Sequence, residues 1–430
     1  MKKISILCAI MSCLFVIASC AVACSPKKTG TNTIKIGVKT AGSEMASITA
    51  IINAYKDKNP DVAVEKVKIP ADYDQWMMQS KAAHNLPDVV FTQDDTVAYY
   101  ASQGVFESLD KYISKDKIDT SMYYDSIMSI SKPLQDGKTY FMPRDYNKVV
   151  CYYNKKIFTQ AGIEYPVEGW TWEDFLSTCE RLKTYFGSDS AKYPVAADVA
   201  WKAVYWPVIA SYGEKILDEN NKLSLTASSK GLQALISLVE NGYTSVPTTS
   251  GGGGGAAFFK VGNVAMIFDV RPNLSNYVSL DFDVVSFPAI NTNNTPRIGT
   301  GCSGYAINAE SKNKDVAWDF LKFMASEDGQ KAFCKTGNCV PLIKSMSEAT
   351  EWKNITVSGK DLSAKNHNAF IDYQERDIKT NYMINVAPDK QKNVYQVIDD
   401  FILAVFGTKY KGNLQGCIDA YSKQVANAVK

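Results

Sequence analysis

The sequence predicts an α/β fold with more than one hydrophobic core. The chain has 430 residues, which is longer than one ordinary core supports and suits two domains. Near its beginning, short apolar runs typical of strands alternate with segments whose apolar residues recur at helical spacing. This strand–helix–strand–helix–strand order predicts a parallel sheet covered by helices.

The elements of this first sheet can be justified one by one. The strands show alternating or continuous apolar residues, the helices show one apolar face, and a proline ends the first helix. In order, they are a strand at 34–38, a helix containing Ile48, Ile51, Ile52 and Tyr55 that stops at Asn59-Pro60, a strand at 62–67, a helix at about 73–84 and a strand at 89–91. Ligands of such sheets bind beyond the carboxyl ends of the strands. We therefore single out Asp94 and Asp95, which follow the third strand.

From Tyr140 onward the pattern changes, because a strand at 149–153 follows with no helix before it. Thr171 is a suitable N-cap for the next helix, and Glu173 and Asp174 suit its first turn. The later expected elements are a helix at about 231–240 ended by Gly242, strands at 264–268 and near 304–307, a helix with Val316, Phe320, Phe323 and Met324, and a C-terminal helix with Val394, Val397, Ile398, Phe401, Ile402 and Val405 on one face.

The composition excludes several classes of function. Hydrophobic residues make up 46% and charged residues 21% of the chain, and its formal net charge is +2, so neither disorder nor nucleic-acid binding is indicated. His84 and His367 are the two histidines, and the mature region has no CxxC pair, so no zinc site of ordinary spacing is expected. We expect neither a metal nor another cofactor.

The first residues have the layout of an export signal rather than of a folded segment. Lys2 and Lys3 precede a short apolar stretch, and Ile17-Ala18-Ser19-Cys20 then has the form of a bacterial lipobox. We predict a signal peptide at 1–19, lipidation of Cys20 with Cys24 as the alternative, and a flexible tether that ends at residue 33. An ordinary signal peptide with an incidental cysteine is the competing interpretation.

Two further sequence motifs are a closely spaced pair of cysteines and a run of five glycines. Cys334 and Cys339 flank a turn-like spacer, and a disulfide between them is plausible in an exported protein, although spacing alone does not fix connectivity. The run Gly251 to Gly255 lacks the Lys-Ser/Thr ending of a phosphate-binding loop. We therefore interpret it as a flexible loop.

The motifs along the mature chain resemble, in order, those of the extracellular solute-binding proteins of ABC sugar importers, the family that includes maltose-binding protein. Each block is weak alone, and their order behind a lipobox is what makes the resemblance specific. The blocks are Pro87-Asp88-Val89-Val90 with Asp94-Asp95 and 104–109, Asp136-Gly137-Lys138-Thr139-Tyr140 with Met142-Pro143 and Tyr153-Asn154-Lys155, residues 170–175, Phe259-Lys260-Val261-Gly262-Asn263-Val264-Ala265-Met266, and Ala317-Trp318-Asp319-Phe320-Leu321.

The resemblance implies a two-lobed, type II periplasmic-binding-protein-like fold. The ligand cleft would lie between two α/β lobes, which close over the ligand by a hinge motion. Three chain crossings are expected, near 146–150, 297–301 and 335–340. They would divide the chain into a first lobe of 34–147 plus 298–337 and a second lobe of 148–297 plus 338–430.

The candidate ligand contacts follow from what sugars offer, which is hydroxyl groups and apolar C–H faces. Asp95 is the first choice for hydroxyl groups, with an N-cap role as its alternative. Polar residues in corresponding loops of the family are further candidates, each weighed against an ordinary turn or packing role: Asp94, Lys39, Thr40, Ser43, Arg144, Asp145 and Ser303.

Aromatic rings could stack on a sugar. Trp201 is the best candidate, with core packing as its alternative, and Tyr205 lies one helical turn further. Trp172, Trp206 and Trp318 read as structural. Where the family often carries a stacking Trp, this chain instead has Asp269, Arg271 and Asn273, which suggests hydrogen bonds in its place.

The resemblance implies a lipid-anchored, monomeric protein outside the cytoplasm that binds a sugar and delivers it to the permease of an ABC importer. We therefore expect no catalysis. The alternatives are an exported carbohydrate-active enzyme, for which Asp94 and Asp95 would be the paired carboxylates, and a surface receptor without a transport role. The absence of a basic cluster favours a neutral sugar over phosphorylated solutes, polyols or peptides.

Overall fold

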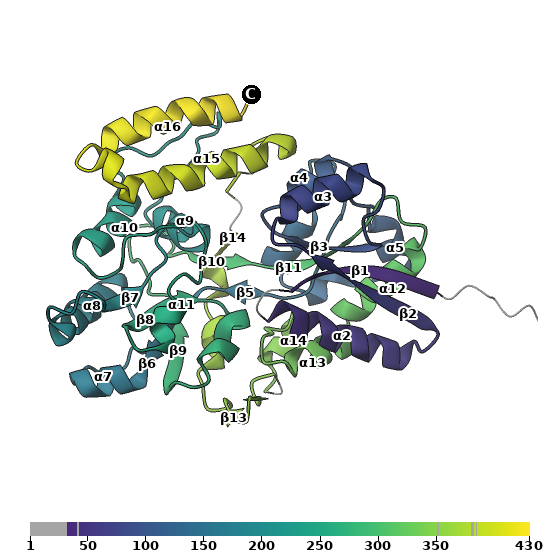
Figure 1. The fold of residues 1–430 in the computed structure, drawn as a ribbon, viewed down its shortest axis with the longest axis horizontal. Coiled ribbons are helices and arrows are strands. Elements are labelled where there is room, and N and C mark those ends of the chain that lie inside the picture. The colour runs from purple at the N-terminus through teal and green to yellow at the C-terminus, as the bar shows by residue number, and fades with distance from the viewer. Residues whose placement is uncertain (1–31, 41–42, 351, 380–381, 384) are drawn as a thin grey trace, which may run out of the picture.

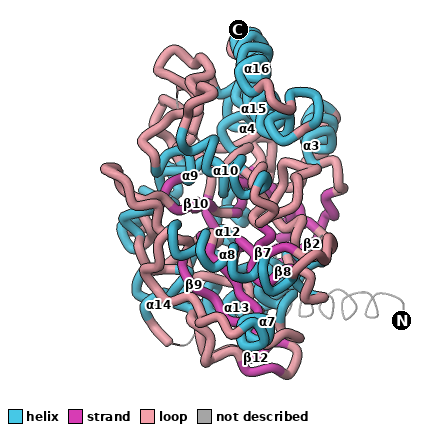
Figure 2. Tube along the Cα trace, turned by 90° about the vertical axis from the view of Figure 1, so that its left-hand side faces the viewer, coloured by secondary structure: helices cyan, strands magenta, loops and turns pink. Residues whose placement is uncertain are grey.

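The computed structural model describes residues 32–40, 43–350, 352–379, 382–383 and 385–430. Two mixed sheets form the centres of its two halves, and a smaller sheet lies between them (Figure 1). The expected α/β class and the two-part arrangement are therefore present. Figure 2, turned by 90°, shows the strands inside and α15 (Pro388–Phe406) and α16 (Leu414–Ala428) together at one end.

The five-stranded sheet has the order β2-β1-β3-β11-β4. Its strands are β1 (Asn32–Lys39), β2 (Val62–Ile69), β3 (Val89–Gln93), β4 (Met142–Pro143) and β11 (Ser303–Ile307). β1 runs parallel to both β2 and β3, which confirms the parallel sheet predicted from the first elements of the sequence. β11 is antiparallel to β3 and to β4, so chain from a distant part of the sequence completes this sheet.

The four-stranded sheet has the order β7-β8-β6-β9. It consists of β6 (Val150–Asn154), β7 (Tyr193–Ala196), β8 (Val264–Asp269) and β9 (Phe282–Ser286). β8 is parallel to β7 and antiparallel to β6. Each strand is buried along nearly its whole length because helices or loops cover both faces, as the continuous apolar runs in the sequence suggest.

A three-stranded sheet of β14 (Asp377–Lys379), β10 (Ile298–Gly301) and β5 (Asn147–Lys148) joins the two larger sheets. β5 lies between β4 and β6 in the chain, and β10 runs almost directly into β11. The two sheets are therefore linked through two short antiparallel segments. A separate hairpin contains β12 (Thr356–Val357) and β13 (Lys360–Asp361).

Helices surround the sheets. Their bounds are α2 (Glu44–Lys58), α3 (Tyr73–Ala82), α4 (Val97–Ser102), α5 (Asp110–Asp116), α6 (Asp125–Met128), α7 (Lys155–Ala161), α8 (Trp172–Phe186), α9 (Lys202–Ser211), α10 (Lys230–Glu240), α11 (Ala256–Lys260), α12 (Lys314–Ala325), α13 (Glu327–Cys334) and α14 (Lys344–Glu348). α2, α12 and α13 pack together beside the five-stranded sheet, and α15 contacts both α4 and α10.

Helix α8 shows how local sequence fixes an element. The Thr171 hydroxyl accepts a hydrogen bond from the Asp174 N–H, and the Asp174 carboxylate accepts one from the Thr171 N–H. This capping box satisfies two N–H groups that the first turn leaves free. Trp172 and Phe175 on the apolar face are buried, which confirms the predicted N-terminus and the structural role of Trp172.

The four-stranded sheet separates two hydrophobic clusters. Successive side chains of a strand point to opposite faces. Accordingly, Tyr152 joins the cluster that continues into the five-stranded sheet, whereas Cys151 and Tyr153 join the cluster under α8, α9, α10, α15 and α16. We call them the first and second core clusters. The first extends through both large sheets, and the second belongs to one half of the molecule.

Candidate functional site

Polar side chains gather where the strands of the two large sheets end at the crossing segments. β1 ends at Lys39 and β3 at Gln93, and the Lys39 ammonium donates to Gln93 Oε1 over 2.9 Å. Burial lowers the pKa of Lys39, although the nearby carboxylates of Asp95 and Glu44 oppose that effect. The carboxyl-end rule therefore leads to a region that is both charged and largely buried.

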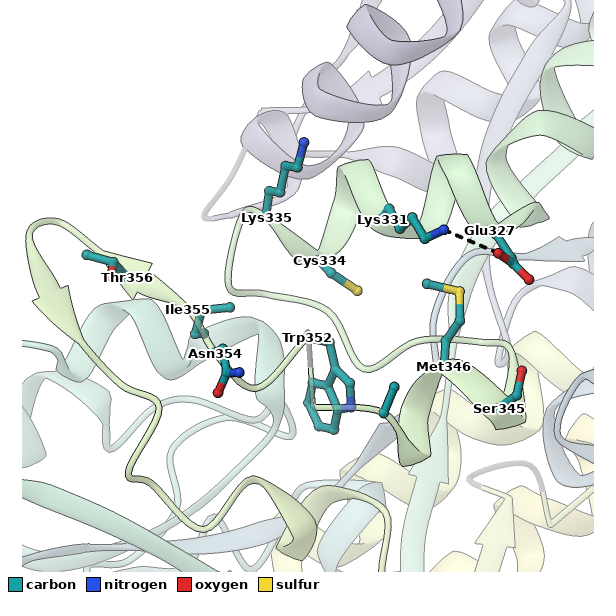
Figure 3. A pocket seen from close by; sticks show the side chains of 11 residues that line it. Glu327, Lys331, Cys334, Lys335, Ser345, Met346, Trp352, Asn354, Ile355 and Thr356 are labelled. Atoms are coloured by element: carbon teal, nitrogen blue, oxygen red, sulfur yellow. Dashed lines mark hydrogen bonds and ion pairs between the residues drawn. The ribbon is translucent and has the colours of Figure 1, made fainter.

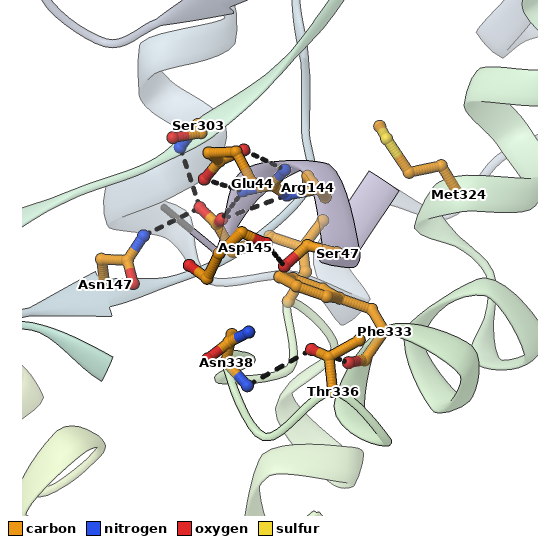
Figure 4. Close-up of polar contacts among 12 residues, drawn as sticks. Glu44, Ser47, Arg144, Asp145, Asn147, Ser303, Met324, Phe333, Thr336 and Asn338 are labelled. Carbon is orange, nitrogen blue, oxygen red and sulfur yellow. Dashed lines mark hydrogen bonds and ion pairs between the residues drawn. The ribbon is translucent and has the colours of Figure 1, made fainter. Parts of the chain in front are cut away.

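Arg144 forms the centre of one polar group at this edge (Figure 4). Its guanidinium, which is 1% exposed, donates to both carboxylate oxygens of Glu44 over 2.7 and 3.0 Å and to Asp145 Oδ2 over 2.7 Å. Asp145 Oδ1 accepts from Asn147 Nδ2 and from the Ser303 N–H. Residues from α2, the β4–β5 link and β11 are thus tied together.

The electrostatics of this group favour the charged pair of Arg144 and Glu44. Burial alone would raise the pKa of Glu44, but the bidentate contact with Arg144 outweighs it and lowers that pKa. Burial raises the pKa of Asp145 despite the same guanidinium. One cation therefore serves a buried carboxylate, that of Asp145, and a partly buried one, that of Glu44, so this part of the site holds no excess positive charge.

A second polar group bridges the two halves of the molecule. The Lys202 ammonium, at the start of α9, forms an ion pair with Asp95 Oδ2 after β3. It also lies 4.8 Å from the ring centre of Tyr395, which is on α15. Burial opposes charge on both partners, but their mutual attraction lowers the pKa of Asp95 and raises that of Lys202. Both therefore remain charged near neutral pH.

The glycine run lies against residues that precede α9. The Asp198 carboxylate accepts from the Gly253 N–H over 2.7 Å. A Cβ atom at Gly252 would lie 2.5 Å from the Trp201 ring, so that ring packs directly on the glycine backbone. The side chains of Asp198 and Trp201 therefore hold this loop in place, whereas the sequence alone suggested a flexible loop.

Asp269 is the last residue of β8 and Arg271 lies just after it, and no described hydrogen bond joins the two side chains. Asp269 accepts from Tyr277, Asn273 and its neighbouring backbone N–H. Arg271 donates from Nε to the Gly337 carbonyl, contacts His367 Nδ1, and lies against the Trp352 and Phe370 rings. Burial lowers the pKa of Arg271 to about 10.

The turn at 337–340 connects these groups. Its Val340 carbonyl accepts from the Tyr146 N–H, next to Asp145, and its Gly337 carbonyl accepts from Arg271. Asn338, between them, is 4% exposed (Figure 4). The turn, which follows α13, thus joins the backbone just before β5 to the Arg271 side chain just after β8.

Several polar atoms of these groups are buried without a partner. A buried polar atom that makes no hydrogen bond is costly, so such atoms mark places where a ligand or water is needed. Among the described residues they include Asp95 Oδ1, Asn147 Oδ1, Arg271 Nη2, Asn338 Oδ1 and Tyr395 Oη. Asn147, Asn338 and Arg271 belong to the group around Asp145 and the 337–340 turn, and Asp95 and Tyr395 both contact Lys202. We take these two groups as the candidate ligand site.

The predicted site residues are distributed unevenly over this region. Asp95, Arg144, Asp145 and Ser303 belong to the polar groups described above. Tyr205 is fully buried, and its hydroxyl is bonded to Tyr382 and Asp399.

The other predicted ligand contacts lie at the margins of the candidate ligand site. Thr40 is exposed, and Ser43 immediately precedes α2. The Asp94 N–H donates to the Cys302 carbonyl, and Asp94 lines a separate cavity of about 230 Å³ beside the start of α15.

Sequence reasoning missed Glu44, Asn147, Lys202, Asn338 and Tyr395. Lys202 adjoins the predicted Trp201 and could have been found as the next residue of the same loop. Nothing near Tyr395 in the sequence marks it as a ligand contact, because a tyrosine on the apolar face of a helix is normally a core residue.

Another cavity, of about 640 Å³, lies between α13 and α14 and is lined partly by Met346, Trp352 and Ile355 (Figure 3). None of its lining residues carries one of the unpartnered buried atoms, so we do not assign the ligand to it. Cys334 borders this cavity. Cys334 and Cys339, for which a disulfide was expected, are buried free thiols in the structure.

Other sequence predictions concern the N-terminal segment and metal binding. The signal peptide and both candidate lipidation sites, Cys20 and Cys24, lie outside the described residues. Within the described ranges, no helix is sufficiently long and apolar to span a membrane, and no cluster of His, Cys, Asp and Glu has the composition of a metal site.

Comparison with known proteins gives consistent matches. Residues 40–331 match the family described as bacterial extracellular solute-binding protein. The galactooligosaccharide-binding protein of Bacillus subtilis is 22% identical over 307 residues, which cover 68% of this chain and 69% of that protein.

Solved structures show the same fold. An ABC substrate-binding protein of Listeria monocytogenes in complex with cycloalternan superposes with a TM-score of 0.77 at 19% identity, covering 92% of this chain and 98% of the other. UgpB of Mycobacterium tuberculosis in complex with glycerophosphocholine gives 0.76 at 20% identity, covering 93% and 99%. These likenesses confirm the predicted periplasmic-binding-protein-like fold.

Proposed function

The chain belongs to the family of bacterial extracellular solute-binding proteins, and from this premise we propose that it captures a sugar and delivers it to the permease of an ABC importer. The observation that carries the proposal is the set of unpartnered buried atoms on residues of the two polar groups, around Arg144 and Asp145 and around Lys202. Sugars carry many hydroxyl groups, each of which can donate and accept a hydrogen bond. The sugar specificity of the Bacillus subtilis relative supports the same ligand class.

The ligand contacts that we propose combine the predicted residues with those that the geometry adds. Carboxylates and amides would bind hydroxyl groups, and Trp201 would offer a ring face. The proposed set is Asp95, Arg144, Asp145, Asn147, Trp201, Lys202, Asp269, Arg271, Ser303, Asn338 and Tyr395, with Asp94, Thr40, Ser43 and Tyr205 at the margins.

We propose two lobes, one of 34–147 plus a segment that starts at 298 and one of 148–297 plus the C-terminal segment, and we move the expected boundary between 337 and 338 further along the chain. The first two crossings coincide with β5 and β10. For the third, the backbone of Ile343 still pairs with Tyr123, in the half that contains the five-stranded sheet. Only later does the Asn366 N–H donate to Asp283, which lies in the four-stranded sheet of the other half. These contacts favour a third crossing further along the chain than 335–340.

We further propose that the protein acts without turnover, as a monomer held at the membrane by a lipid on Cys20 or Cys24. The rival enzyme would need two carboxylates placed across a glycosidic bond. Asp95 is instead paired with Lys202, which lowers its pKa and makes it a poor proton donor near neutral pH. Chromatography of oligosaccharides after long incubation with the protein would reveal cleavage products if the enzyme interpretation were correct.

The central experiment is a thermal-shift screen of the mature domain against mono-, di- and oligosaccharides. A ligand that binds only the folded state raises the melting temperature as its concentration increases. A dose-dependent shift that is lost in Asp95→Ala and Trp201→Ala supports sugar capture at this site. If no carbohydrate produces a shift while a polyol, a phosphodiester or a peptide does, the sugar assignment is wrong.

A further inference from the structure

The Lys202 ammonium touches two residues that each carry an unpartnered buried oxygen. It is ion-paired with Asp95 Oδ2, while Asp95 Oδ1 has no hydrogen-bond partner among the described residues. The Lys202 ammonium also lies over the Tyr395 ring. Tyr395 is only 7% exposed, and its hydroxyl likewise has no hydrogen-bond partner among the described residues. One cation and two orphaned oxygens therefore lie together at the junction of β3, α9 and α15.

These three groups have complementary hydrogen-bonding needs. Asp95 Oδ1 can only accept, the Lys202 ammonium can only donate, and the Tyr395 hydroxyl can do both. A hydroxyl group that donates to the carboxylate can accept from the ammonium at the same time. A second hydroxyl on the adjacent carbon could in turn donate to or accept from the tyrosine hydroxyl.

The charges around Lys202 decide against an anionic ligand. Three carboxylates, those of Asp95, Asp94 and Asp399, act on this ammonium, and Lys39, which acts on Asp95, adds only one further positive charge. A phosphate or carboxylate group placed here would meet net negative charge in a poorly solvated region, which disfavours it. An uncharged group with hydroxyls keeps the Lys202–Asp95 pair intact and adds hydrogen bonds to it.

We propose that Asp95, Lys202 and Tyr395 form a clamp for two adjacent hydroxyl groups of an uncharged solute. This inference rests on the proposed function and narrows its ligand class to neutral sugars or polyols with a vicinal diol. It also makes Tyr395 a specificity residue, because its hydroxyl makes no hydrogen bond to the described residues and is free to bind the ligand.

Tyr395→Phe is the most direct test, because it removes only the orphaned oxygen and keeps the ring beneath Lys202. The matched control is Tyr243→Phe: Tyr243 is 8% exposed, and its hydroxyl donates to Glu180 over 2.8 Å. Unfolding by urea and calorimetric titration of a sugar from the screen would be measured for both variants.

The two variants are expected to behave in opposite ways. Tyr395→Phe should weaken sugar binding by about 3- to 10-fold, the effect of one hydrogen bond, with no loss of stability in the unliganded protein. Tyr243→Phe should lose stability and keep its affinity. Unchanged affinity in Tyr395→Phe, or a loss of stability equal to that of the control, would overturn the clamp.

The ligand class is tested with wild-type protein. Its titrations would use D-glucose, D-galactose and maltotriose, the monodeoxy analogues of whichever sugar binds, and glucose 6-phosphate and glycerophosphocholine as charged probes. The clamp requires at least a tenfold loss for removal of one hydroxyl of an adjacent pair, and weaker binding of the phosphorylated sugar than of its parent.

The outcomes separate the two proposals. If no carbohydrate binds the wild-type protein, sugar capture fails and the clamp fails with it. If a sugar binds but every monodeoxy analogue binds equally well, the clamp alone is wrong. Tighter binding of a charged probe than of any neutral one would also overturn the clamp.

Discussion

Arg144 and Arg271 are both fully buried, yet Arg144 contacts two carboxylates whereas Arg271 contacts none among the described residues. The partners of Arg271 are instead a backbone carbonyl, a neutral histidine and two aromatic rings. Burial lowers the pKa of His367 to about 3, so this histidine is uncharged near neutral pH. Two arginines of equal burial thus have different electrostatic roles.

This contrast predicts different costs for removing each guanidinium. Arg144→Met leaves the buried Asp145 and the partly buried Glu44 without the guanidinium that lies between them, and we expect it to lower the free energy of unfolding by about 3–5 kcal/mol. Arg271→Met removes a charge that has no counter-ion, so its cost should be nearer 1–2 kcal/mol, from the lost hydrogen bonds. Urea unfolding of both variants measures the difference. Equal losses would contradict the role assigned to the carboxylates.

A second prediction concerns the pH dependence of stability. Burial raises the pKa of Asp198 from 3.8 to about 6. The folded state therefore binds this proton more tightly than the unfolded state does, and its contribution to stability increases as the pH falls from about 6 to 4. Asp198→Asn should keep the bond from the Gly253 N–H and lose this dependence. Melting curves recorded at intervals between pH 4 and 7 would reveal it, and parallel profiles for the two proteins would refute it.

The glycine run supplies a third prediction, with its own control. Gly252→Ala places a methyl group 2.5 Å from the Trp201 ring, so the ring must move. We expect a lower melting temperature, altered tryptophan fluorescence and weaker binding of any sugar that stacks on Trp201. Gly251→Ala meets nothing within 4 Å and should leave all three measurements unchanged. Identical behaviour of the two variants would mean that Trp201 does not depend on the loop.

The capping box of α8 gives a fourth prediction. Thr171→Ala removes the hydroxyl that accepts from the Asp174 N–H and should cost about 1 kcal/mol of stability. Thr171→Ser retains the hydroxyl and should cost much less. Chemical unfolding of the two variants provides the comparison, and a serine variant as unstable as the alanine variant would indicate that packing of the threonine methyl is responsible.

Some features could be predicted because their causes are close together in sequence. The box formed by Thr171 and Asp174 lies within four residues, and the position of Asp95 followed from the rule that parallel strands carry their sites at their carboxyl ends. The parallel pairing of β1, β2 and β3 followed from the helices between them. In each case, local patterns were sufficient.

The remainder of the site depends on tertiary contacts. Lys202 lies 107 residues from Asp95, and a lysine in the first turn of a helix ordinarily reads as solvent-exposed. Tyr395 reads as an ordinary core aromatic until α15 is placed beside α9. Tyr205 shows the reverse: its spacing from Trp201 suggested a shared binding face, but packing against α15 uses its hydroxyl within the protein.

The buried thiols have a practical consequence for following how the molecule opens. Cys302, Cys334 and Cys339 lie in the first core cluster, and Cys151, Cys179 and Cys417 lie in the second. Each is 0–8% exposed, so an alkylating reagent reaches it only during a fluctuation that uncovers it. Alkylation rates measured by mass spectrometry at these six native cysteines would therefore report the opening rate of each core cluster separately, with no engineered cysteine or attached label.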